Sequence, residues 1–202
     1  RYARSDGPMN RWGPDGPPPE AYSRVTNPER FRPLHDFVLT LLAQLHASFD
    51  VDRFEGHGLD SELEVGAVAR PSVRLVPRDS KAAPVTVTFT PFPGLRVRAG
   101  RWCTDAFPGC GCDACDETAN DETIRLAEMI DEVVAGRFRE GIAMPPEGEV
   151  WQEWERWSPP RRFSGRLLID PERARAMLAG IEGSAIEWAA WTRRQASVGS
   201  IR

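Results

Sequence analysis

All four cysteines of the chain lie in one short stretch rich in glycine and acidic residues, "RWCTDAFPGCGCDACDETANDE". Their spacing is C-x6-C-x-C-x2-C, and they are Cys103, Cys110, Cys112 and Cys115. Four thiolates can enclose a Zn²⁺ ion tetrahedrally, and the last two cysteines have the two-residue spacing of a zinc knuckle. The pattern therefore predicts a Zn²⁺ site in this stretch.

Two glycines between the cysteines affect which of the cysteines can reach the same ion. Gly109 and Gly111 allow the tight turn that would bring Cys110 to the ion shared by the last two cysteines. Cys103 is the predicted fourth ligand, and His57 is the alternative to it. Four protein ligands leave no open coordination position, so the predicted role of the metal is structural rather than catalytic.

Two other interpretations of the same cysteines stay open. Cys112 and Cys115 have the spacing of a thioredoxin-like redox pair, and a position at a helix N-terminus lowers the pKa of a thiol. The stretch can equally be a cysteine-rich turn with buried thiols or a disulfide. Asp113, Asp116 and Glu117 argue against both a zinc–thiolate centre and a reactive thiolate, because nearby negative charges repel a thiolate.

Two helices are predicted from apolar residues that recur at three- and four-residue steps. The first runs from Pro33 to about Phe49. The second contains a stripe from Ile124 to Phe138, with acidic residues at its start, and Gly141 is expected to end it. The cysteine stretch therefore leads directly into a core helix.

Strands are predicted on both sides of the second helix. Residues 50–61 are expected to form a loop, and period-two alternation of apolar and polar residues then indicates half-buried strands. The five strand segments are 61–77, 83–92, 94–102, 149–157 and 163–169. An antiparallel meander is the economical arrangement of the first three.

The carboxyl-terminal part carries two further helix signals. Asp170 is a good N-cap for a short helix that begins at Pro171. Ser184 and Glu187 have capping-box spacing, so a last helix is predicted in "SAIEWAAWTRR".

These elements predict an α+β fold with the order α-β-β-β-α-β-β-α. In it, an antiparallel sheet, a meander plus a carboxyl-terminal strand pair, is packed by two long helices. Residues 1–20 are rich in proline and glycine and are interpreted as an extended arm. Residues 21–202 form a single predicted domain, with 145–202 as a candidate appended half.

The overall composition narrows the function classes. A net charge of −4 and a pI near 5.5 argue against nucleic-acid binding, because domains that bind nucleic acid usually carry a basic surface. The sequence contains no apolar run that approaches the roughly 20 residues of a membrane helix, and its amino-terminal residues do not resemble a signal peptide. We therefore expect a cytoplasmic protein without a membrane or nucleic-acid partner, in a compartment where thiols stay reduced.

Two features are candidates for binding surfaces, and for each of them a structural interpretation is favoured. Five of the seven tryptophans lie near the carboxyl end, at 151, 154, 157, 188 and 191. They either mark a protein-partner site or, as we favour, attach the carboxyl-terminal half to the core. Arginines 74, 96 and 98 and threonines 86, 88 and 90 can share a sheet face, interpreted as solvated rather than as an anion site.

Familiar catalytic motifs such as GxSxG, a Walker loop, GxGxxG or HExxH are missing from the sequence. The leading hypothesis is therefore a non-catalytic protein that acts through protein contacts and carries a structural zinc at its cysteine cluster. The alternative is a thiol-based redox or small-molecule enzyme that uses Cys112 and Cys115.

At "FTPFPGLRVRAGRW", "FPGCGCDACDE" and "VVAGRFREG" the chain resembles an uncharacterised family of small proteins from high-GC bacteria. The resemblance extends from about Tyr22 to the last predicted helix, and the cysteine stretch is its most specific part. The family is a domain of unknown function, so the resemblance implies no activity, ligand or catalytic residue.

Overall fold

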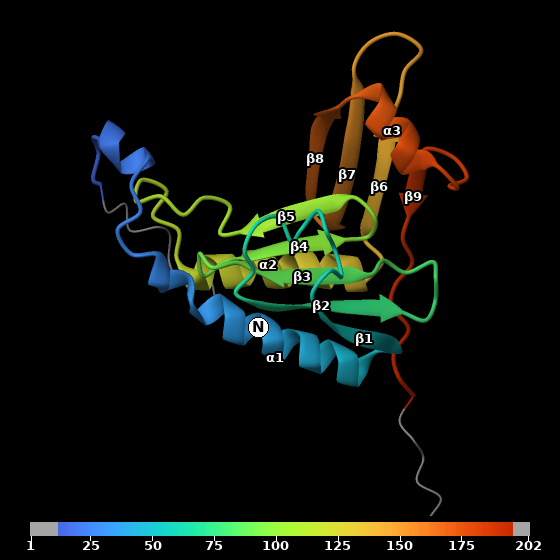
Figure 1. The fold of residues 1–202 in the computed structure, drawn as a ribbon, viewed down its shortest axis with the longest axis horizontal. Coiled ribbons are helices and arrows are strands. Elements are labelled where there is room, and N and C mark those ends of the chain that lie inside the picture. Colours follow the sequence, from blue (N-terminus) through green and yellow to red (C-terminus); the bar gives the residue numbers. More distant parts are fainter. Residues whose placement is uncertain (1–11, 196–202) are drawn as a thin grey trace, which may run out of the picture.

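The computed structural model describes residues 12–195, and Figure 1 shows them as two antiparallel sheets with three α-helices. The predicted α+β class and antiparallel pairing are confirmed. Of the predicted arm 1–20, residues 1–11 lie outside the described residues, as do residues 196–202 at the other end. The short 3-10 helices η1 (Pro19–Tyr22) and η2 (Pro28–Phe31) lead into the first long helix.

The first sheet is a five-stranded meander in the order β1-β2-β3-β4-β5. Its strands are β1 (Val51–Gly56), β2 (Arg70–Pro77), β3 (Val85–Phe89), β4 (Leu95–Ala99) and β5 (Cys103–Phe107). Helices α1 (Pro33–Ser48) and α2 (Ala119–Val134) cover one face of this sheet (Figure 1). Their apolar stripes and the inward-facing strand residues make one buried core, which includes Leu34, Val38, Leu42, Val73, Val85, Val97, Leu126, Ile130 and Val133.

The other face of the first sheet is not solvated as predicted, because the loop of residues 57–69 covers part of it. Thr86 and Thr88 are buried there. The Arg96 guanidinium donates to the carbonyl oxygens of Leu63 and Val65. Ion pairs to loop carboxylates hold Arg98 as well. The guanidinium groups of both arginines are therefore bound by carbonyl and carboxylate oxygens of the same chain.

The second sheet has the order β8-β7-β6-β9 and rises from one side of the first (Figure 1). Its strands are β6 (Phe138–Ala143), β7 (Val150–Ser158), β8 (Arg161–Ile169) and β9 (Ala185–Glu187). Helix α3 (Pro171–Leu178), capped by Asp170 as predicted, packs on it around a small second core. The predicted strands at 149–157 and 163–169 are confirmed as β7 and β8.

Glu140 joins the two sheets. Its buried carboxylate accepts hydrogen bonds from the backbone N–H groups of Arg101, Trp102 and Cys103, at 2.6, 2.8 and 2.9 Å. The indole N–H of Trp188 donates to the same carboxylate at 3.0 Å. A carboxylate from β6 therefore holds the turn between β4 and β5.

Four predicted elements differ from the structure. The strand predicted at 61–77 begins only at Arg70, because residues 61–69 belong to the loop that covers the sheet. Helix α2 does not continue to Gly141, because the chain reverses at Gly136, whose φ is +68°, and Gly141 lies inside β6. Residues 50–61 are not all loop, since 51–56 form β1 against β2. Residues 184–194 do not form a helix, because β9 completes the edge of β6.

The physical reason for the last error is tertiary. The edge of β6 offers unpaired backbone groups, and the two tryptophans that follow β9 are buried in the main core. The indole of Trp188 bonds Glu140, and that of Trp191 donates to the carbonyl oxygen of Ala83 at 2.9 Å. The two indoles therefore attach the carboxyl-terminal segment to the core, which confirms the favoured interpretation for these two of the five tryptophans; the other three lie on β7 and are partly exposed.

Candidate metal centre

The cysteine stretch follows β5 and ends at α2, at the end of the molecule where η1 and η2 also lie (Figure 1). The Sγ atoms of Cys110 and Cys112 are 3.2 Å apart, and those of Cys112 and Cys115 are 3.5 Å apart. All three sulfurs lie within 4.8 Å of one another. Zinc–sulfur bonds of about 2.3 Å place tetrahedral ligands ~3.8 Å apart, so the three sulfurs fit the ligand set of one ion.

Cys103 and His57 are not part of this group of sulfurs. Cys103 is buried in β5, where burial raises the pKa of its thiol to about 12. Its backbone N–H is held by Glu140. His57 lies just beyond β1, close enough to Glu64 to influence that carboxyl electrostatically. The structure thus brings together three of the four cysteines named from the sequence.

The loop that carries the sulfurs is docked on the amino-terminal segment. The N–H groups of Asp113 and Ala114 donate to the carbonyl oxygens of Arg24 and Ala21, at 2.8 and 3.1 Å. The Asp113 carboxylate in turn accepts from Thr26, through both N–H and hydroxyl, and from the Arg24 guanidinium. These hydrogen bonds, that of the Thr26 N–H first, lower the pKa of Asp113. The negative charge of Asp113 is therefore stabilised by the same contacts that hold the loop on the amino-terminal segment.

Arg30 supports the backbone of the same loop. Its guanidinium donates to the carbonyl oxygens of Gly111, Cys112 and Glu117, at 3.0, 3.3 and 3.2 Å. Arg30 thus brings a positive charge to the backbone of the loop. Because Arg24 is paired with the Asp113 carboxylate, one of the three acids that argue against a thiolate centre is neutralised.

Sequence reasoning missed these supporting residues. Arg24, Thr26 and Arg30 precede the cysteines by more than 80 positions, as the separations of their hydrogen-bonded pairs show. No local motif signals such a contact. A lone arginine-rich segment before a helix is also common on solvated surfaces, so only the tertiary structure identifies its role.

The three thiols influence one another strongly. A hydrogen bond from the Cys110 thiol lowers the pKa of Cys112, and the backbone N–H groups of Cys115 and Ala114 add to this. Hydrogen bonds with the Cys112 and Cys110 thiols raise the pKa of Cys115 to about 12. Three sulfurs this close cannot all ionise without a cation between them. A metal ion bound between the sulfurs would supply that charge and displace the protons.

The geometry is less suited to a redox pair. Cys112, the thiol with the lowered pKa, is buried, whereas Cys115 is exposed. Disulfide exchange needs an accessible thiolate. Here the thiol that ionises more readily is the buried one and not the one that faces solvent. Helix α2 begins at Ala119 with Thr118 as its N-cap, so neither cysteine lies in its first turn.

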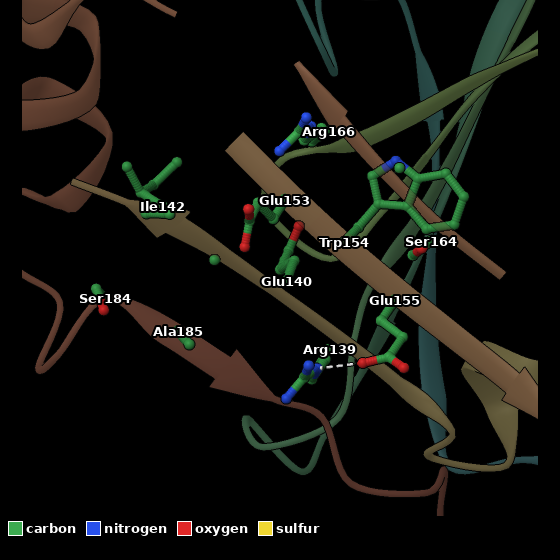
Figure 2. Close-up of a pocket in the computed structure, with 13 residues that line it drawn as sticks. Arg139, Glu140, Ile142, Glu153, Trp154, Glu155, Ser164, Arg166, Ser184 and Ala185 are labelled. Atoms are coloured by element: carbon green, nitrogen blue, oxygen red, sulfur yellow. Dashed lines mark ion pairs between the residues drawn. The ribbon is translucent and has the colours of Figure 1, made fainter. Parts of the chain in front are cut away.

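A separate hollow of about 700 Å³ lies on the second sheet (Figure 2). Arg139 and Glu155 form an ion pair of 2.6 Å across it, and Arg162 binds the other oxygen of the same carboxylate. Arg166, on the rim, lies over the Trp151 ring at 4.3 Å. Arg139 and Arg162 therefore share one carboxylate, and both charged and apolar side chains line the hollow.

Within residues 12–195, none of the helices is long and apolar enough to cross a membrane. A search of curated proteins and a search of solved structures each found no match to the chain. One family model, described as a family of unknown function, matches residues 7–195, which is nearly the whole chain. The chain therefore belongs to this family, DUF6226.

Proposed function

We propose that this protein binds one zinc ion through Cys110, Cys112 and Cys115. The observation that carries the proposal is the convergence of the three sulfurs within 4.8 Å of one another. Thiolates are soft ligands that select zinc among the common divalent ions of cells, ahead of magnesium, calcium and manganese. The lowered pKa of Cys112, caused first by its hydrogen bond with the Cys110 thiol, supports the thiolate form of that residue.

The role of the metal is to hold the cysteine loop in place for contacts with another protein. The loop lies on residues 21–30, and apolar side chains are exposed in the same region: Tyr22, Val25 and Phe92 are 61%, 42% and 37% exposed. Apolar groups gathered around a rigid loop are typical of protein-binding surfaces. The protein then acts through contacts and not through catalysis, in the cytoplasm, where its thiols stay reduced.

Elemental analysis of untagged protein tests the metal. We expect one zinc per chain in the wild type and loss of most of it in Cys110→Ser, Cys112→Ser and Cys115→Ser. Cys103→Ala is the matched control, because that thiol lies in the core and should leave the zinc content unchanged. Wild-type protein purified without metal, and unable to take up added zinc, would contradict the proposal.

Protein contact is tested by affinity capture with zinc-loaded and chelated protein. Partners recovered with the zinc-loaded wild type should be lost from a Tyr22→Ser, Val25→Ser variant that keeps its zinc. Equal recovery by wild type and variant would show that this surface is not the contact site.

Thiol redox chemistry is the second candidate, and the 3.5 Å separation of the Cys112 and Cys115 sulfurs is the observation that favours it. A small movement would bring them to the bonding distance of about 2.05 Å. Reduced, metal-free protein should then reduce insulin disulfides, and its mass should fall by two hydrogens as its own disulfide forms. Turnover in the wild type that Cys115→Ser abolishes would select this function over zinc binding.

A further inference from the structure

The three-sulfur site is one ligand short of the four that zinc takes in structural sites. All four cysteines and all three histidines of the chain lie within the described residues, so the other candidates can be placed. Cys103 is buried in β5. The ring of His35 is bound to the carbonyl oxygen of Gly94 at 3.0 Å, while His46 lies on α1 and His57 beyond β1. A fourth sulfur or imidazole ligand therefore does not come from this chain.

Neighbouring carboxylates do not complete the site either. In residues 12–195, no aspartate or glutamate oxygen joins the three sulfurs within the 4.8 Å that groups them. Asp113 is engaged by Arg24 and Thr26. Asp116 directly follows Cys115, and Glu117 comes next along the chain. The Glu117 carboxylate accepts the Cys110 N–H at 3.1 Å.

The unfilled position faces outward. Cys112 is buried, whereas the side chains of Cys110 and Cys115 are exposed, so an ion held by all three sits at the surface of the loop. The inner side of the loop is closed: the Phe92 ring lies against Gly111, and Arg30 binds the loop carbonyls. A ligand can therefore approach only from the solvent side.

We propose that the fourth zinc ligand is a thiolate supplied from outside the chain, and this inference rests on the zinc site proposed above. Three thiolates bring the Zn²⁺ centre to a net charge of −1, and a fourth brings it to −2. Arg30, which donates to three backbone carbonyl oxygens of the loop, adds a positive charge to its surroundings, whereas Arg24 is already paired with Asp113. A fourth sulfur completes the four-cysteine ligand set that is common in structural zinc sites.

The exchange is balanced without an oxidant. The incoming thiol loses its proton to the medium, its sulfur forms a bond to zinc, and the water molecule that held the fourth position leaves. The thiolate can belong to a small cellular thiol or to a cysteine of a docked protein, including a second copy of this chain. All of these supply the same ligand chemistry.

Cobalt-substituted protein reports the number of sulfur ligands through its sulfur-to-metal charge-transfer absorption. Titration with 2-mercaptoethanol should raise that absorption saturably by roughly one third, from three sulfur ligands to four. Ethylene glycol, the oxygen analogue, should have no effect. X-ray absorption of the zinc protein should change from three sulfurs with one lighter ligand to four sulfurs.

One variant and the zinc content of the protein keep the test decisive. If Glu117→Gln changes the spectrum of the thiol-free protein, Glu117 is the fourth ligand and the inference is wrong. If the spectrum is unchanged by thiol while zinc stays at one per chain, the inference fails and the proposed zinc site stands. If the protein binds no metal, the proposed zinc site itself is wrong, and the inference about a fourth ligand is wrong with it.

Protein concentration separates the sources of the thiolate. A four-sulfur spectrum that grows with protein concentration, together with dimer formation in size-exclusion chromatography, identifies a second copy. Cys103→Ala should leave this response unchanged, because Cys103 is buried in β5 and a second copy can offer only the exposed Cys110 or Cys115. A response to 2-mercaptoethanol that is independent of protein concentration identifies a small thiol.

Discussion

Replacing Asp113 by asparagine tests whether the docking of the cysteine loop supports metal binding. The side chain is 1% exposed and accepts hydrogen bonds from Arg24 Nε at 3.0 Å and from the N–H and hydroxyl of Thr26 at 3.0 and 3.1 Å. Asparagine can keep its carbonyl oxygen toward Thr26. Its NH₂ group then faces the guanidinium of Arg24, so two donors meet and the ion pair is lost.

Two physical effects of Asp113→Asn have opposite signs. If the nearby acid acted only by its charge, removing it would strengthen binding of zinc by three thiolates, because a net anionic centre would be less repelled. If the docking contacts matter more, the loop loosens and affinity falls. Groups that orient metal ligands typically contribute ten- to a hundredfold in affinity. We expect the second effect and a loss of roughly tenfold or more.

The assay is competition for zinc with a chromogenic chelator at neutral pH. Asp116→Asn is the matched control, since it removes the same charge from the same loop, and asparagine tolerates the positive φ of 50° at that position. We expect its zinc affinity to be unchanged or slightly higher. If both variants bind zinc more tightly than the wild type, charge dominates and the docking argument is refuted.

Three further outcomes follow from the structure. Glu140→Ala leaves four N–H donors without their carboxylate and should lower the free energy of unfolding by about 3–5 kcal/mol in urea titrations, and a midpoint equal to wild type would contradict this. Because the pKa of Cys115 is raised to about 12, its thiol must release a proton on binding zinc. Zinc affinity should therefore rise at least roughly tenfold per pH unit from about pH 7 to 10, and a pH-independent affinity would exclude Cys115 as a ligand. Removal of zinc by a chelator should speed proteolytic cleavage within residues 108–117 but not within β3, and uniform acceleration would indicate global unfolding instead.

Local patterns were sufficient for much of the fold. The three- and four-residue steps that predict α1 and α2 reflect the need of each helix to bury one face. This pattern involves only residues close together in the sequence, so it can be recognised without the tertiary structure. The same holds for the period-two strands β3 and β4 and for the cap and proline that begin α3. β9 escaped prediction because its conformation depends on the edge of β6, a partner more than 40 positions away.

The same distinction between local sequence and tertiary contacts applies to the candidate site. Clustering of the cysteines and the glycines between them are properties of the sequence, and they were enough to predict that Cys110, Cys112 and Cys115 meet. That Cys103 stays in the core depends on β5 being bound to Glu140 of the other sheet. The arginines that contact the cysteine loop come from a distant segment. Sequence therefore determines the local clustering of the sulfurs, whereas tertiary packing decides how many of the four cysteines meet and which charges lie around them, since both depend on residues far apart in the chain.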